Sequence, residues 1–203
     1  PPAARIMQAS AIEDDDDDDL FADDADDGAA GTMWLGLDRS GCDAPAAPLV
    51  SEADFVNALQ STPEQLALVG RRIGDAGLLQ LTAALASGAG ASLKDLDLEA
   101  NDIGDAGAVA LADACVAGAL PQLAALSLSD NAIGSRGLAS FATMLSGGSA
   151  RLAQLSTLNL NANTMGDDGL ASLGGAIGGG ALSSLSKLYI AKNGYGDAGL
   201  RAF

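Results

Sequence analysis

One recurring pattern constrains the fold of this chain more than any other feature. It first occurs in full as LKDLDLEANDI at residues 93–103, which places Leu93, Leu96 and Leu98 ahead of an asparagine. The aligned asparagines of successive copies are Asn101, Asn131, Asn163 and Asn193, and they lie 30, 32 and 30 residues apart. A fixed period of this length is typical of stacked repeats in which every unit supplies one short strand and one return segment. The chain is therefore expected to form a solenoid.

A second pattern follows each strand segment. It reads IGDAG at 73–77 and 103–107, IGSRG at 133–137, MGDDG at 165–169 and YGDAG at 195–199. Apolar residues then recur with a spacing that lines one face of a helix. Each unit is predicted to run strand, turn, helix and return loop, with about five units in the chain. The first unit is irregular, because Arg71 stands where the asparagine is expected.

A repeat of about 30 residues that reads LxxLxLxxNxIGDxG resembles the ribonuclease-inhibitor class of leucine-rich repeat. The same class occurs in NOD-like receptors and in the Ran GTPase-activating protein. The resemblance covers residues 63–203. It implies an α/β leucine-rich-repeat solenoid with parallel strands on a concave side and helices on a convex side, and it implies that the chain binds proteins.

The composition divides the chain into three parts. Residues 1–50 form an acidic low-complexity extension and linker, residues 51–62 a predicted N-terminal cap helix, and residues 63–203 the repeat domain. The cap helix is predicted because Ser51 is followed three residues later by Asp54, a carboxylate version of the capping box. The last repeat is incomplete at Phe203, so we expect either a longer protein or another chain that covers this edge.

The acidic extension dominates the charge of the chain. The net charge is −17, and the first 30 residues hold 11 acidic residues against one arginine, Arg5. Such a field repels nucleic acid and anionic lipid, and it favours a basic protein surface as the partner. The tail residues predicted to contact that partner are Asp14, Asp15, Asp16, Asp17, Asp18, Asp19 and Trp34. A solubilising tail and calcium binding are alternatives for the aspartates, although an unbroken run lacks the spacing of a calcium loop. Packing on the cap helix is the alternative for Trp34.

The strand register predicts which side chains line the concave face. Alternation along a strand sends Leu96 and Leu98 into the core and the intervening side chains to the other side. The predicted partner-binding residues of this face are Asp95, Asp97, Glu99, Ser127, Ser129, Asn159, Asn161, Lys187, Tyr189 and Lys192. They run from acidic to neutral to basic along the chain, and Tyr189 is the best candidate for an energetic hot spot. An ordinary solvated sheet face is the alternative.

The repeated asparagines have a predicted structural role instead. An amide side chain offers donors and an acceptor, so each asparagine can satisfy backbone groups in its turn and link one unit to the next. Asn101, Asn131, Asn163 and Asn193 are assigned to this role.

Nothing in the sequence indicates catalysis. The chain has no histidine, and the acidic residues of the concave face have no partner base. Cys115 takes a slot that leucine or isoleucine fills in other repeats, so it is predicted to be a buried core residue. The glycine-rich stretch at 174–180 lacks the Lys-Ser/Thr of a phosphate-binding loop. We therefore predict no enzyme activity, no cofactor and no metal site.

These observations predict a non-catalytic protein-interaction module that serves as a peripheral or scaffolding subunit of a hetero-oligomeric complex. The alternative is a regulatory protein of the GTPase-activating or NOD-like type. In the Ran-directed family the acidic segment follows the repeats, whereas here it precedes them. We expect an intracellular protein without a membrane span, since only two cysteines occur and no long apolar run is present. The start at Pro1 and the Ala/Gly-rich composition favour a plastid or mitochondrion, reached after removal of a targeting peptide.

Overall fold

The computed structural model describes residues 51–147, 152–180 and 183–203. Five short strands form one parallel sheet, in which each strand pairs with the next one along the chain. The strands are β1 (Gln65–Ala67), β2 (Asp95–Asp97), β3 (Ala125–Ser127), β4 (Thr157–Asn159) and β5 (Lys187–Tyr189). The register aligns the middle leucine of every strand, from Leu66 opposite Leu96 to Leu158 opposite Leu188. The predicted α/β leucine-rich-repeat solenoid is confirmed.

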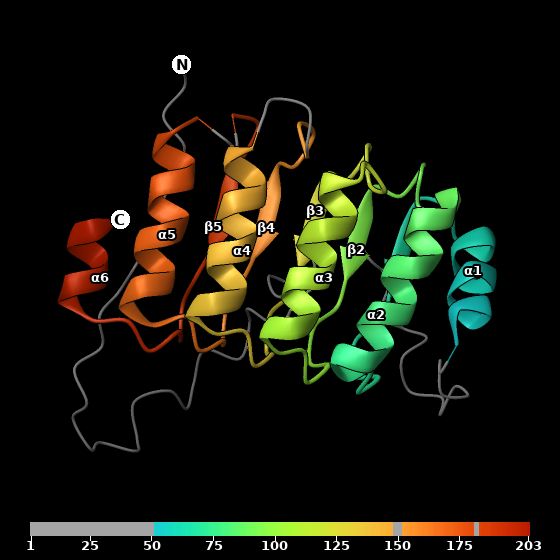
Figure 1. Cartoon of the computed structure of the whole chain (residues 1–203), viewed down its shortest axis with the longest axis horizontal. Coiled ribbons are helices and arrows are strands. Elements are labelled where there is room, and N and C mark those ends of the chain that lie inside the picture. Colours follow the sequence, from blue (N-terminus) through green and yellow to red (C-terminus); the bar gives the residue numbers. More distant parts are fainter. Residues whose placement is uncertain (1–50, 148–151, 181–182) are drawn as a thin grey trace, which may run out of the picture.

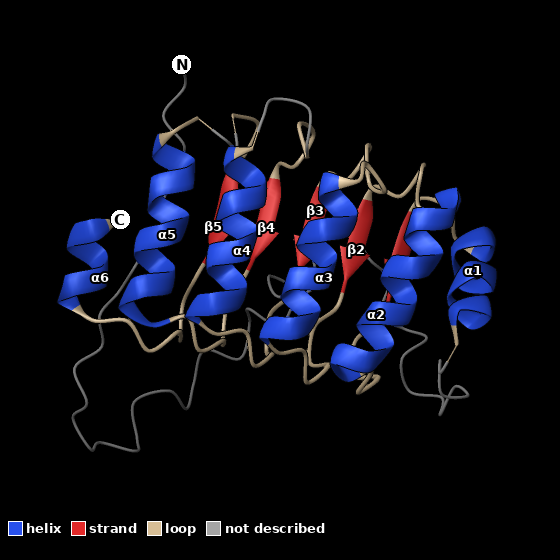
Figure 2. Ribbon diagram, in the orientation of Figure 1, coloured by secondary structure: helices blue, strands red, loops and turns tan. Residues whose placement is uncertain are grey.

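The helices cover one side of this sheet (Figures 1 and 2). They are α1 (Glu52–Ser61), α2 (Gly74–Ala84), α3 (Asp105–Val116), α4 (Ser135–Ser146), α5 (Gly166–Gly178) and α6 (Asp197–Ala202). A wide helical turn, η1 (Leu85–Ala89), extends α2. Repeat 1 consists of β1 and α2, repeat 2 of β2 and α3, repeat 3 of β3 and α4, repeat 4 of β4 and α5, and repeat 5 of β5 and α6.

The core lies between the sheet and the helices. Leu96, Leu126 and Leu158 are fully buried in the three inner strands, and the apolar face of each helix packs onto them. Burial of this apolar surface is the main favourable term for a repeat fold, because a single repeat cannot enclose its own leucines. Cys115 is buried in this core, and burial raises the pKa of its thiol to about 12.

Helix α1 closes the solenoid at the β1 end, where it lies beside α2 (Figure 1). The Ser51 side chain accepts a hydrogen bond from the Asp54 N–H, and the Asp54 carboxylate accepts one from the Ser51 N–H. This capping box fixes the start of the helix. Phe55 and Leu59 then reach the core, where their exposed fractions are 0% and 1%. The helix thus buries apolar surface that an end repeat would expose.

The acidic extension, with Asp14 to Asp19 and Trp34, lies outside the described residues. Within the part of the chain that is described, no helix has both the length and the apolar composition needed to cross a lipid bilayer.

Candidate protein-interaction surfaces

A row of asparagines crosses the solenoid where the strands end. The Asn131 side-chain amide donates to the carbonyl oxygens of Leu98, Leu128 and Ser129, at 2.9, 3.1 and 3.0 Å. Its Oδ1 atom accepts from the N–H groups of Asn101 and Ile103 in the preceding repeat. One side chain therefore closes its own turn and bonds to the repeat before it. Asn101, Asn163 and Asn193 each donate in the same way to their own turn and to the preceding repeat.

A second row, of aspartates, links the helix starts, and sequence reasoning did not assign it. Asp75 Oδ1 accepts hydrogen bonds from the N–H groups of Gly104 and Gly107 in the next repeat, at 2.7 and 2.9 Å. Asp105 does the same for Gly134 and Gly137, and Asp167 for Gly196 and Gly199. Each carboxylate caps the helix of the following repeat, where free N–H groups and the helix dipole favour negative charge. The Gly-Asp pairs that recur at 74–75, 104–105 and 166–167 are the feature of the sequence from which this role could have been predicted.

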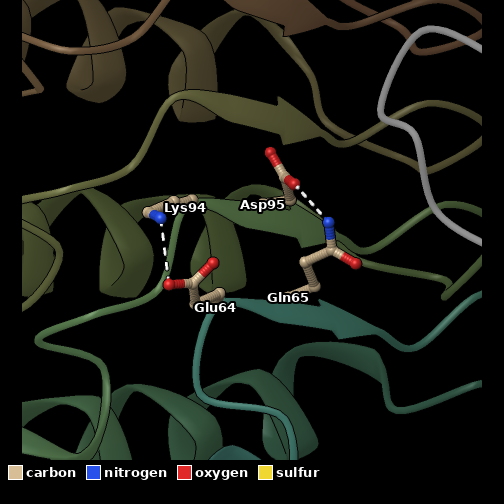
Figure 3. A network of polar contacts seen from close by, with 4 residues as sticks. All are labelled: Glu64, Gln65, Lys94 and Asp95. Atoms are coloured by element: carbon tan, nitrogen blue, oxygen red, sulfur yellow. Dashed lines mark hydrogen bonds and ion pairs between the residues drawn. The ribbon is translucent and has the colours of Figure 1, made fainter.

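The acidic end of the concave face, the side of the sheet away from the helices, is held by bonds between strands (Figure 3). The Gln65 side-chain amide donates to Asp95 Oδ2 at 3.0 Å, and Lys94 Nζ lies 3.0 Å from Glu64 Oε1. Desolvation raises the pKa of Asp95 above its ordinary value, although the bond from Gln65 and the charge of Lys94 act in the opposite direction. The raised pKa means that the ionised form of Asp95 lacks full compensation for its burial.

The predicted residues at the centre of this face are mostly buried. Ser127, Ser129 and Asn159 are buried, and so is Asp97 in the neighbouring strand β2. The Ser129 hydroxyl donates to Glu99 Oε2 at 3.0 Å. The Asn161 side-chain oxygen accepts from the Ala191 N–H at 2.8 Å. Ser129 and Asn161 therefore bond to neighbouring repeats, whereas Asp97 and Asn159 accept hydrogen bonds from backbone N–H groups of their own repeats.

The other end of the face carries basic and aromatic residues. Lys187 begins β5 and Lys192 follows it, and both are exposed, while Tyr189 is half-buried. The sheet order places β3 and β4 between these residues and the acidic residues of β2. The predicted partner-binding residues thus form two separate groups of opposite charge, not one cluster.

The convex side has a groove of about 540 Å³ between α3 and α4. Val109, Ala112, Val116 and Met144 contribute its apolar lining, and Asp113 and Arg136 add one charge of each sign. Val116 is 40% exposed, which is unusual for a large apolar side chain in this molecule. The sequence analysis did not find this groove, because its lining comes from two repeats whose helix faces meet only after folding.

The described residues contain no group of three or more His, Cys, Asp or Glu side chains arranged to hold a metal ion. The polar groups of the two rows bond mainly to backbone atoms of neighbouring repeats. These bonds link each repeat to its neighbours.

Comparison with known proteins agrees with this architecture. A family model described as Leucine Rich repeat matches residues 91–112, 122–142 and 154–174, which belong to repeats 2, 3 and 4. Together with the five-stranded parallel sheet, these matches support a leucine-rich-repeat fold for the chain.

A solved structure with a similar fold is that of leiomodin-1 actin-binding site 2. It aligns with a TM-score of 0.55 and 17% sequence identity over 68% of this chain and 76% of the leiomodin chain. At this identity the likeness concerns the fold alone. No curated protein sequence matches the chain.

Proposed function

We propose that the chain is a non-catalytic protein-interaction module and a peripheral or scaffolding subunit of a larger hetero-oligomeric assembly. The observation that carries this proposal is the separation of charge along the concave face, with Asp95 and Glu99 at one end and Lys187 and Lys192 at the other. A partner with the complementary distribution is attracted at both ends in one orientation only, so charge sets its orientation. Tyr189 adds an aromatic side chain of the type that supplies much interface energy.

The acidic extension is the second contact surface in this proposal. Aspartates 14 to 19 would meet a basic protein surface, and Trp34 would add an apolar anchor. Deletion of residues 1–30 is expected to release the chain from its complex during native purification. Unchanged co-purification would exclude Asp14 to Asp19 as contacts. We place this subunit in an organelle, and fractionation of cells that express the full-length protein tests that location.

Charge reversal on the concave face tests the proposal directly. Lys187→Glu changes the charge at the basic end, and Arg136→Glu makes the same change on the convex helix α4. Both residues are exposed, so neither change is expected to disturb the core. We expect Lys187→Glu to lower the yield of co-purified partner at least about tenfold, because repulsion replaces attraction at a bound charge. Arg136→Glu should leave the yield unchanged, and equal yields for the two variants would contradict concave-face binding.

Two defined partners separate this proposal from its alternatives. We assign the repeats to the ribonuclease-inhibitor-like class on the LxxLxLxxNxIGDxG motif, and a GTPase-activating or NOD-like regulatory role is the alternative that follows from that class. A GTP hydrolysis assay with Ran-type GTPases should show no stimulation, and stimulated turnover would contradict a non-catalytic module. The second defined probe is actin, because the similar structure is an actin-binding site of leiomodin-1, and cosedimentation of the chain with actin measures this binding.

A further inference from the structure

The five repeat helices begin in two different ways. Helices α3, α4 and α6 are preceded by Gly104, Gly134 and Gly196, all of which have extended backbone, with φ of −102°, −93° and −112°. In contrast, α2 and α5 begin at Gly74 and Gly166, whose φ values are +58° and +59°. Positive φ is a left-handed conformation that glycine adopts readily.

The two kinds of start follow the row of aspartates. The helices with an extended glycine are those that receive a carboxylate from the preceding repeat, through Asp75, Asp105 or Asp167. Helix α2 has no preceding repeat in the sheet, and α5 follows the repeat in which Ser135 takes the place of aspartate. Ser135 still lies next to α5, because a Cβ atom on Gly169 would be 3.2 Å from the Ser135 Cα. The close packing between residue 135 and α5 is therefore retained, but the carboxylate acceptor is missing.

The acceptor of the glycine N–H differs between the two kinds of helix start. Gly104, Gly134 and Gly196 donate to a carboxylate of the preceding repeat. Gly74 and Gly166 donate to the backbone carbonyl oxygens of Asn101 and Asn193 in the following repeat, at 2.9 and 3.0 Å. A glycine with extended backbone therefore bonds to the preceding repeat, and a glycine with positive φ bonds to the following repeat.

The hydrogen bond accepted by the asparagine Oδ1 atom is also weaker where the glycine has positive φ. Asn131 Oδ1 accepts from Ile103 at 2.9 Å and Asn163 Oδ1 accepts from Ile133 at 3.0 Å. Where the glycine is left-handed, Asn101 Oδ1 is 3.4 Å from the Ile73 nitrogen. Asn193 Oδ1 is buried and has no hydrogen-bond donor among the described residues. Loss of the aspartate thus accompanies a weaker bond at the neighbouring asparagine.

We infer that residue 135 sets how α5 begins, and that serine at this position makes the junction between repeats 3 and 4 the joint at which the solenoid opens first. Repeat proteins are stabilised by their own repeats and by contacts between neighbours, so a junction that lacks two charge-assisted hydrogen bonds is the weaker one. The joint lies between the acidic residues of β2 and the lysines of repeat 5. Bending there changes the distance between the two charged groups, and this last consequence alone rests on the proposed function.

The test is to supply the missing carboxylate in the full-length chain. Ser135→Asp should bring Gly166 from positive φ to extended φ, as measured by NMR couplings and chemical shifts. It should also slow hydrogen exchange of the α5 amides at least tenfold relative to Ser135→Ala, since local opening then breaks two additional bonds. A gain confined to α4 would reflect only an added charge in the first turn of that helix, and it would overturn the inference.

The reciprocal change provides a second measurement. Asp105→Ser removes the cap of α4, and Gly134 should then adopt positive φ as Gly166 does in the natural chain. If Asp105→Ser does not fold, the Ser135→Asp result decides alone. Retention of positive φ at Gly166 in Ser135→Asp, with α5 exchange equal to that of Ser135→Ala, would overturn the inference.

Discussion

Two polar side chains in each complete link, one asparagine and one aspartate, hold neighbouring repeats together. Asn131 bonds to repeat 2 through both its side-chain nitrogen and its side-chain oxygen. Asp105 of repeat 2 accepts a hydrogen bond from Gly137 in α4, the helix of repeat 3. These bonds satisfy backbone groups that the strand ends and helix starts leave open. The rows therefore determine spacing between repeats, while the leucines supply most of the burial.

Replacement of Asn131 by alanine tests the asparagine row. The change leaves the Leu98 carbonyl group and the N–H groups of Asn101 and Ile103 without a side-chain partner. Because each buried polar group without a partner costs about 1–3 kcal/mol, the free energy of unfolding should fall by about 3 kcal/mol or more. Urea unfolding measures the loss, with the exposed Asn57→Ala in α1 as the control. A loss below about 1 kcal/mol would contradict the linking role.

The Asp95 carboxylate gives a prediction for pH. Its pKa in the folded chain is raised above the ordinary 3.8, mainly by desolvation, so folding disfavours its ionised form. Its contribution to stability is therefore present below the unfolded pKa and is lost as pH rises through the folded pKa. Relative to Asp95→Asn, the wild-type chain should gain stability as pH falls from about 7 to about 4. Urea unfolding of both proteins at each pH measures this difference, and a change of the opposite sign would contradict the assignment.

The helices pack at a distance that glycine permits. A Cβ atom on Gly137 in α4 would lie 2.7 Å from Asp105 Oδ1 and 3.1 Å from the Cβ of Ala108. Gly107 and Gly199 occupy the same place in α3 and α6, where a Cβ would meet Asp75 and Asp167 at 2.6 Å. The second glycine of the IGDAG pattern is thus explained by the approach of the aspartate from the preceding repeat.

Two glycine substitutions should have opposite effects. Gly137→Ala forces Asp105 away from its helix cap and should lower the free energy of unfolding by about 1–3 kcal/mol. Gly175→Ala in α5 places its Cβ in open space, so it should raise stability by up to about 1 kcal/mol through helix propensity. Thermal and urea unfolding measure both changes. Equal effects would show that the close approach at Gly137 has no energetic consequence.

The strands could be predicted because their leucines repeat with a regular period, and Leu96 and Leu126 are paired as that period requires. The helix faces followed from the same spacing. The role of Asp75 and Asp105 could not be predicted, since each acts on the next repeat and its glycine partners lie about 30 residues away. Burial of Asp97 and Ser127 also escaped prediction, because alternation tells which side a residue faces and not how closely that side is packed.

The complete solenoid combines one regular sheet with two irregular features. Charge is divided between the ends of the concave face, and the aspartate row is interrupted at Ser135 between those ends. In a linear array of repeats, each unit contacts only its neighbours, so a weak junction divides the array into two parts. The molecule therefore has an acidic part formed by repeats 1 to 3 and a basic end in repeat 5. Partner binding across both parts would fix their relative position.

Hydrogen exchange of the full-length chain, free and bound to the protein that co-purifies with it, tests the concave-face account most directly. Binding is expected to slow exchange in the peptides that contain residues 95–99 and 187–192. Exchange in α4, from Ser135 to Ser146, should change little, because this helix lies on the opposite side of the sheet. Protection confined to the convex helices, with both strand segments unchanged, would contradict binding through the concave face.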